Sequence, residues 1–238
     1  MHTPYVQLGG KAPVIILPDA DLSVAANNGK LLSRSDLTFL GLPKISHVAI
    51  VLFHSTLNAG QICMSTERVL VPEHLVDLFT DALQQAARKS DRFGQDSHEA
   101  LFSTASARRI DGMVDEALEQ GAKAVVGGKA ASGDQRGMLD RAEYPITILG
   151  NVTRDMAIWK EETFGPLAIV VSIKPIGDGE SSIDDALVLA ANDSSYGLAA
   201  SIFSKDIGRA LKIARRLQTG MVRINAGTVG DDPTVVFG

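Results

Sequence analysis

The residue best suited to covalent chemistry is Cys63, the only cysteine of the chain. It lies in a short stretch between Gly60, a predicted helix end, and a predicted strand that begins at Glu67. A connection of this kind can expose a thiol to a cleft and direct backbone N–H groups at a bound substrate. A single cysteine is more often a small buried hydrophobic residue, so its position alone leaves both interpretations open.

A second group of chemically capable side chains lies in EETFGP at residues 161–166, just before a predicted buried strand. Its carboxylates could accept hydrogen bonds from ribose hydroxyls, and its aromatic ring could pack on a flat cofactor. A solvated pair of acids and a core phenylalanine are the simpler alternatives. His54 could form a dyad with Cys63, although a position on a helix surface is the simpler interpretation.

Other common sites are poorly supported by the residue spacing. The five histidines lack the spacing of metal ligands, and one thiol cannot make a multi-cysteine centre, so we expect no metal. Residues 9–11 (GGK) and 177–182 (GDGESS) lack the full spacing of phosphate-binding loops and are predicted to be turns.

Composition narrows the classes of function. The chain has 238 residues, 45% of them hydrophobic and 21% charged, which predicts one globular domain over residues 1–238. The net charge of −5 argues against a nucleic-acid partner. Apolar runs are far shorter than the roughly 20 residues that cross a bilayer, so no membrane partner is expected. With one cysteine and no apolar leader segment, we expect a cytoplasmic protein.

Short apolar runs alternate with amphipathic stretches, which predicts an α/β fold with a mostly parallel sheet flanked by helices. Because most of these runs are apolar throughout, both faces of the sheet should be covered. The predicted strands span residues 14–17, 67–71, 124–126, 145–149, 167–173, 198–203 and 221–224. The predicted helices span residues 74–89, 104–120, 183–191 and 207–218, and residues 130–141 are predicted to form a surface loop.

Five segments in a fixed order carry a family resemblance. They are QLGGKAP at 7–13, GQIC at 60–63, EETFGP at 161–166, NDSSYGLA at 192–199 and GMVRIN at 220–225. Together they resemble the signature segments of the NAD(P)-dependent aldehyde dehydrogenases, and within that family the vanillin and salicylaldehyde dehydrogenases. The fold implied is the catalytic domain of that family without its N-terminal cofactor-binding domain.

The resemblance implies a reaction and assigns residues to it. Cys63 stands at the position of the thiolate that attacks the carbonyl carbon of an aldehyde. A hydride then leaves that carbon to the nicotinamide of NAD or NADP, and water hydrolyses the resulting thioester. Glu162 matches the carboxylate that holds the nicotinamide ribose, and Phe164 matches the aromatic residue beside the nicotinamide. Gly9 is also expected to be a cofactor-binding residue. The expected partner is a small-molecule aldehyde, and full-length members form homo-oligomers.

One departure from the family pattern affects the chemistry. Gln7 occupies the position of the glutamate that serves as general base. A carboxamide can orient a water molecule but cannot take its proton near neutral pH, so we expect slow or absent deacylation. This keeps two alternatives open, a non-catalytic remnant that acts as a binding module and a thiol esterase that needs no cofactor.

Two further departures concern the extent of the chain. The spacing between Gln7 and Cys63 is longer than in the family, and residues 29–48 are the predicted insertion, either an unspliced segment of a gene model or a genuine surface insertion. The resemblance also predicts truncation at both ends. Because adenine and pyrophosphate contacts belong to the absent domain, cofactor binding by this chain alone is in doubt.

Overall fold

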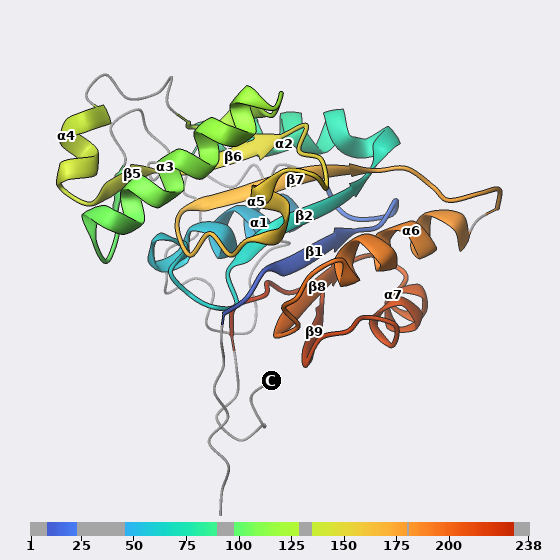
Figure 1. The fold of residues 1–238 in the computed structure, drawn as a ribbon. Coiled ribbons are helices and arrows are strands. Elements are labelled where there is room, and N and C mark those ends of the chain that lie inside the picture. Colours follow the sequence, from blue (N-terminus) through green and yellow to red (C-terminus); the bar gives the residue numbers. More distant parts are fainter. Residues whose placement is uncertain (1–8, 23–45, 90–97, 129–134, 180, 231–238) are drawn as a thin grey trace, which may run out of the picture.

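The computed structural model describes residues 9–22, 46–89, 98–128, 135–179 and 181–230. Within these residues the main element is a seven-stranded sheet with the strand order β4-β6-β7-β2-β1-β8-β9 (Figure 1). All neighbouring strands are parallel except β4 and β6. The strands are β1 (Ala12–Ile16), β2 (Thr66–Pro72), β4 (Lys123–Val126), β6 (Thr147–Gly150), β7 (Leu167–Ile173), β8 (Ala199–Phe203) and β9 (Met221–Ile224). The predicted α/β fold with a mostly parallel sheet is therefore confirmed.

The remaining elements connect and cover this sheet. A small antiparallel sheet pairs β3 (His98–Ala100) with β5 (Glu143–Pro145). The α-helices are α1 (His47–Thr56), α2 (Val76–Arg88), α3 (Thr104–Glu119), α4 (Gln135–Asp140), α5 (Ala157–Lys160), α6 (Ser181–Asn192) and α7 (Ile207–Ala214). Two short 3₁₀ helices, η1 (Leu57–Gly60) and η2 (Glu73–Leu75), precede Cys63 and α2 respectively.

Two apolar layers bury the two faces of the sheet. Successive side chains of a strand point to opposite faces, so β1 contributes Ile15 to one layer and Val14 and Ile16 to the other. Helices α3, α5, α6 and α7 supply the layer that contains Ile15, whereas α1 and α2 supply the layer that contains Val14. Covering helices on both faces explain why most residues of the strands are apolar.

The sequence placed most elements correctly and missed some boundaries. The strands predicted at 167–173 and 221–224 have those bounds in the structure. The strand predicted at 145–149 is divided between β5 and β6, and the last predicted helix ends at Ala214. The surface loop predicted at 130–141 is wrong for its described part, since residues 135–140 form α4.

Helix α1 includes the end of the segment predicted to be an insertion. Its N-cap is Ser46, whose hydroxyl accepts a hydrogen bond from the Ala49 N–H at 3.3 Å. Val48 is fully buried in the layer formed with α2. Residues 46–48 thus belong to the packed domain, whereas residues 29–45 lie outside the described residues and their insertion stays a prediction.

Candidate functional site

Cys63 lies in a tight turn between η1 and β2. The Ser65 N–H donates to the carbonyl oxygen of Ile62 at 2.8 Å and closes this turn. The Cys63 side chain is half-buried, so it is not sealed in the interior. A side chain at Gly60 would run into the carbonyl oxygen of Gly165, which shows how closely the segment before Cys63 packs on the loop before β7.

Two glycines separate Cys63 from Glu162. The Gly10 N–H donates to Oε1 of Glu162 at 2.7 Å. A side chain at Gly10 would collide with the carbonyl oxygen of Cys63, and one at Gly9 would collide with the Glu162 carboxylate. Gly9 also has a φ of 110°, which favours glycine. These glycines therefore form one wall of the site. The predicted turn at residues 9–11 is wrong, because these residues form no turn and lead directly into β1.

The segment from Glu162 to Phe164 is held from two sides. The Thr163 and Phe164 N–H groups donate to the carboxylate of Glu67 at 2.9 and 3.2 Å. From α3, Arg109 donates to the carbonyl oxygens of Glu162 and Thr163. Phe164 has a φ of 46°, unusual for a bulky residue, and its side chain is 40% exposed. We call these hydrogen bonds, to Glu67 and from Arg109, the clamp. The clamp keeps the aromatic ring of Phe164 at the surface although the backbone of this residue is strained.

A buried ion pair lies beneath this segment. The Lys11 ammonium is 2.7 Å from Oε2 of Glu67, and both side chains are buried. Burial lowers the pKa of Lys11, although the neighbouring Glu67 charge opposes the shift. Burial raises the pKa of Glu162, and the Gly10 N–H opposes that shift. The site therefore combines a buried ion pair, Lys11 with Glu67, and a carboxylate, Glu162, whose pKa is higher than that of an exposed glutamate.

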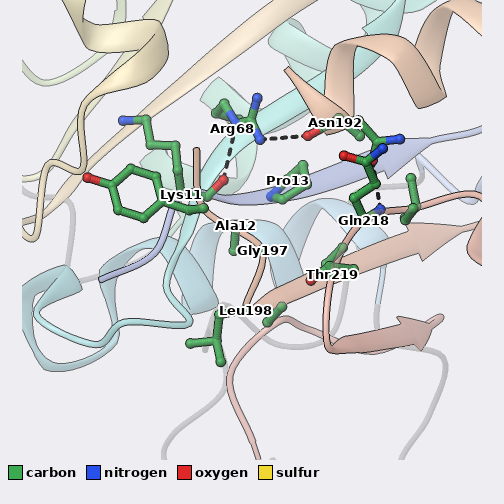
Figure 2. Close-up of a pocket in the computed structure, with 14 residues that line it drawn as sticks. Lys11, Ala12, Pro13, Arg68, Asn192, Gly197, Leu198, Gln218 and Thr219 are labelled. Atoms are coloured by element: carbon green, nitrogen blue, oxygen red, sulfur yellow. Dashed lines mark hydrogen bonds between the residues drawn. The ribbon is translucent and has the colours of Figure 1, made fainter. Parts of the chain in front are cut away.

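Arg68 fastens the other side of Lys11. It donates to the Lys11 carbonyl oxygen at 3.1 Å and to the carbonyl oxygens of Ala190 and Ala191 at the end of α6, at 3.1 and 2.9 Å. Figure 2 shows Arg68 beside Lys11 in a small pocket that Pro13 also lines. Burial lowers the pKa of Arg68 to about 10. Its charge is satisfied by carbonyl oxygens, so Arg68 joins α6 to the start of β1.

Part of the fourth signature segment (Asn192 and residues 196–199) lines the same pocket, together with residues 217–219, which directly precede the fifth segment (Figure 2). Asn192 accepts a hydrogen bond from the Gln218 N–H at 2.9 Å, and its amide donates to the Arg216 carbonyl oxygen at 3.0 Å. The Gly220 N–H donates to the Gly197 carbonyl oxygen at 2.8 Å. In this structure these segments connect the end of α6 to the start of β9.

An apolar cluster borders the other side of Cys63. Its buried members are Met64, Leu198 and Ala199, and the partly buried residues packed against it are Ile62, Cys63, Met221 and Val229. The thiol thus lies where a polar network meets an apolar surface, an arrangement that suits a substrate with a reactive polar group on an apolar body.

His54 supports this cluster instead of facing water. It is only 9% exposed, so the predicted position on a helix surface is wrong. Its Nδ1 accepts a hydrogen bond from the Val229 N–H at 3.2 Å. Burial, with help from the charge of Arg223, lowers the pKa of His54 to about 4, so the ring is neutral at pH 7. Among the described residues no hydrogen bond joins His54 to Cys63, and the structure gives the dyad no support.

The structure therefore brings three predicted site residues together. Cys63, Gly9 and Glu162 meet around Gly10, and Phe164 is joined to them through Glu67. Gln7 lies outside the described residues. The described part of the chain contains no group of three or more metal-ligating side chains and no helix long and apolar enough to span a membrane.

Sequence reasoning missed Lys11, Glu67 and Arg109 as parts of the site. The available signal was a pair of adjacent charges, Glu67 and Arg68, at the start of an apolar strand. Charges at such a position must find partners when the strand is buried.

Comparison with known proteins identifies the family to which this chain belongs. The family model of the aldehyde dehydrogenases matches residues 45–238. The chain belongs to the aldehyde dehydrogenase family. The family predicted from the five ordered segments is thereby confirmed.

Relatives within the aldehyde dehydrogenase family include the expected group. Vanillin dehydrogenase of Pseudomonas fluorescens is 36% identical over 237 residues, which cover 98% of this chain and 41% of that protein. Salicylaldehyde dehydrogenase of Pseudomonas putida is 34% identical over 238 residues, with the same coverage. The chain thus spans about two fifths of the length of these relatives.

Solved aldehyde dehydrogenase structures share the fold. The salicylaldehyde dehydrogenase from Pseudomonas putida G7, complexed with salicylaldehyde, matches with a TM-score of 0.73 and 33% identity, covering 97% of this chain and 40% of that one. Betaine aldehyde dehydrogenase from Staphylococcus aureus, in complex with NAD+, matches with a TM-score of 0.74 and 31% identity over the same shares.

The close approach of Gly10 to Cys63 predicts a cost for any side chain there. Gly10→Ala should destabilise the chain by about 1–3 kcal/mol, because the new methyl group meets backbone that cannot move aside easily. Gly112→Ala is the matched control, since Gly112 lies inside α3 with open space around it and should stabilise the chain by about 1 kcal/mol. Urea unfolding measures both changes, and equal effects would contradict the close contact.

The neutral His54 predicts a loss of stability in acid. In the unfolded chain His54 has its ordinary pKa of about 6.5 and binds a proton below that pH, whereas the native side chain stays neutral down to about pH 4. The free energy of unfolding should therefore fall by roughly 3 kcal/mol as the pH is lowered from 6.5 to about 4. Above pH 6.5 the effect is absent. His54→Gln should remove this part of the pH dependence, whereas His74→Gln, at an exposed position, should keep it. Urea unfolding across this pH range measures the free energy of unfolding of both variants. The same dependence of this free energy on pH in both would refute the attribution to His54.

Proposed function

We propose that this chain is the catalytic part of an NAD(P)-dependent enzyme that oxidises an aldehyde to a carboxylic acid through a thioester on Cys63. The observation that carries the proposal is the packing of Gly9 and Gly10 between the half-buried Cys63 and the Glu162 carboxylate. It puts a nucleophile and a cofactor-binding carboxylate on two sides of one backbone segment.

Cys63 performs the covalent steps in this proposal. Its thiolate attacks the carbonyl carbon, so a C–S bond forms and the negative charge moves to the carbonyl oxygen. The backbone N–H of Cys63 is the proposed donor from this chain to that oxygen. Departure of a hydride from the same carbon leaves a thioester, which water cleaves to release the acid and the free thiol.

The residues on the opposite side of the glycines fit a nicotinamide cofactor. Glu162 uses Oε1 for the Gly10 N–H and has a carboxylate able to accept hydrogen bonds from ribose hydroxyls. The absence of a side chain at Gly9 keeps the backbone against this carboxylate. Phe164 offers an exposed ring two residues further on. When bound, NAD or NADP supplies the hydride acceptor, and solved family structures contain either one.

The apolar cluster beside Cys63 favours an aldehyde with an apolar body. Cys63 packs against the buried cluster of Met64, Leu198 and Ala199, so a substrate carbonyl at the thiol would have apolar side chains nearby. The relatives named for vanillin and salicylaldehyde make an aromatic aldehyde the first substrate to test.

We also propose that the protein is located in the cytoplasm. Self-association is proposed because the family resemblance implies homo-oligomers for full-length members.

Gln7 favours a second candidate function. With a carboxamide in place of the general base, an acyl group transferred to Cys63 would be released slowly. Such a protein could still accept acyl groups from activated esters without any cofactor, as a slow thiol esterase.

Loss of the thiol should abolish both activities. The purified chain is given an aromatic aldehyde with NAD+ or NADP+, and the absorbance of the reduced nicotinamide is followed beside hydrolysis of a nitrophenyl ester. Hydride transfer should be lost in Cys63→Ala and kept in Ser55→Ala, a buried serine on α1. Ester cleavage without hydride transfer supports the second candidate. Hydride transfer that survives Cys63→Ala would end the proposal.

Restoring the general base should accelerate release of the acyl group. Gln7→Glu is expected to raise steady-state thioester turnover by about 10²- to 10⁴-fold, because a carboxylate can take the proton of the attacking water. The initial burst should keep its amplitude. Gln120→Glu makes the same change at an exposed position on the far end of α3 and should leave turnover unchanged. An unaltered rate in Gln7→Glu would exclude this position as the base.

A further inference from the structure

The carboxylate of Glu67 collects three hydrogen-bond donors. Oε2 accepts from the Lys11 ammonium at 2.7 Å and from the Thr163 N–H at 2.9 Å, and Oε1 accepts from the Phe164 N–H at 3.2 Å. Glu67 itself is 2% exposed. A buried charge of this kind is tolerated only when its partners are well placed, so the three donors and the carboxylate fix one another.

These donors come from two segments that lie on either side of the turn containing Cys63. Lys11 directly follows Gly10, which lies against the Cys63 backbone, and Thr163 and Phe164 directly follow Glu162. The Gly10 N–H bond to Glu162 joins the same two segments a second time. Glu67 lies four residues after Cys63, at the start of β2. One side chain therefore binds both segments to the strand that follows Cys63.

The backbone of Phe164 makes this support necessary. A φ of 46° is costly for an aromatic residue and persists only where the surroundings hold it. Arg109 holds the carbonyl side of the segment from an exposed position, whereas Glu67 holds the N–H side from the interior. An amide at position 67 would present one acceptor oxygen and an NH₂ group, which cannot satisfy three donors.

We propose that Glu67 is a positioning residue that places Glu162 and Phe164 beside Cys63 and so sets the affinity for the nicotinamide half of NAD(P). This inference rests on the proposed function, because it takes those two side chains to contact the cofactor. Glu67 touches no reacting atom in this scheme and acts through the backbone of residues 163 and 164.

The experiment compares Glu67→Gln with Glu161→Gln in the full chain. Glu161 is an exposed carboxylate next to Glu162, so its change removes the same charge without touching the clamp. Binding of NAD+ and NADP+ is measured by calorimetry, and amide hydrogen exchange is measured at Thr163, Phe164 and the core of β7. Glu67→Gln should raise Kd by about tenfold or more, in line with the loss of charge-assisted hydrogen bonds. It should speed exchange at residues 163 and 164 and leave β7 unchanged, whereas Glu161→Gln should do neither.

Two results would overturn the proposal. One is exchange at residues 163 and 164 that stays at the wild-type rate in Glu67→Gln. The other is exchange that rises equally in β7, which would mark Glu67 as a general structural residue. Should the wild-type chain bind neither dinucleotide, the proposed function fails, and the exchange pattern together with the alkylation rate of Cys63 still decides whether Glu67 positions the segment.

A second variant covers the case in which Glu67→Gln does not fold. Lys11→Met combined with Glu67→Gln removes the ammonium that would otherwise be buried without its partner. The same local increase in exchange and the same weaker binding are expected. Binding and exchange like those of the wild type in this double variant would show that the pair contributes only to folding.

Discussion

The ion pair between Lys11 and Glu67 is the interaction on which the arrangement of the site depends. Removing two charges from water costs more than their attraction returns unless the remaining oxygens and protons are satisfied. Here the backbone N–H groups of residues 163 and 164 complete the shell of Glu67. Arg68, the next residue on β2, binds the Lys11 carbonyl oxygen, so Lys11 is held at its side chain and its backbone at once. The glycines before Lys11 consequently have little freedom.

The parallel sheet explains why residues so distant in the sequence meet. Strand β2 lies between β1 and β7, with Ala12 paired with Thr66 and Arg68 paired with Ile169. Because these three strands run in the same direction, the segments that precede them gather at one edge of the sheet. Those segments contain Gly9 and Gly10, Cys63, and Glu162 with Phe164. The central position of β2 thus makes its first residues the natural anchor for both neighbours.

The parts of the structure that follow from local pattern were predictable, and those that depend on distant partners were not. Short runs of mostly apolar residues identified β7 and β9 with correct bounds. Glu67 carries no sign in the sequence of its partner, 56 residues away along the chain. Helix α1 is buried nearly all round, so no polar face distinguished a buried His54 from an exposed one. Pro145 lacks a backbone donor and ends β5, which divided a run that appeared to be one strand.

Cys63 lies at the boundary between two environments, and each side depends on a different interaction. On one side the backbone of Gly10 and the Glu162 carboxylate form a polar wall that the buried ion pair holds in place. On the other side Met64, Leu198 and Val229 form an apolar wall, where a neutral His54 accepts the Val229 N–H. Under the proposed function, this asymmetry would place a charged cofactor on one side of the thiol and an apolar aldehyde on the other. Because no hydrogen bond joins the two walls among the described residues, on this proposal we expect substitutions in the polar wall to alter cofactor affinity and to leave the apolar wall unchanged.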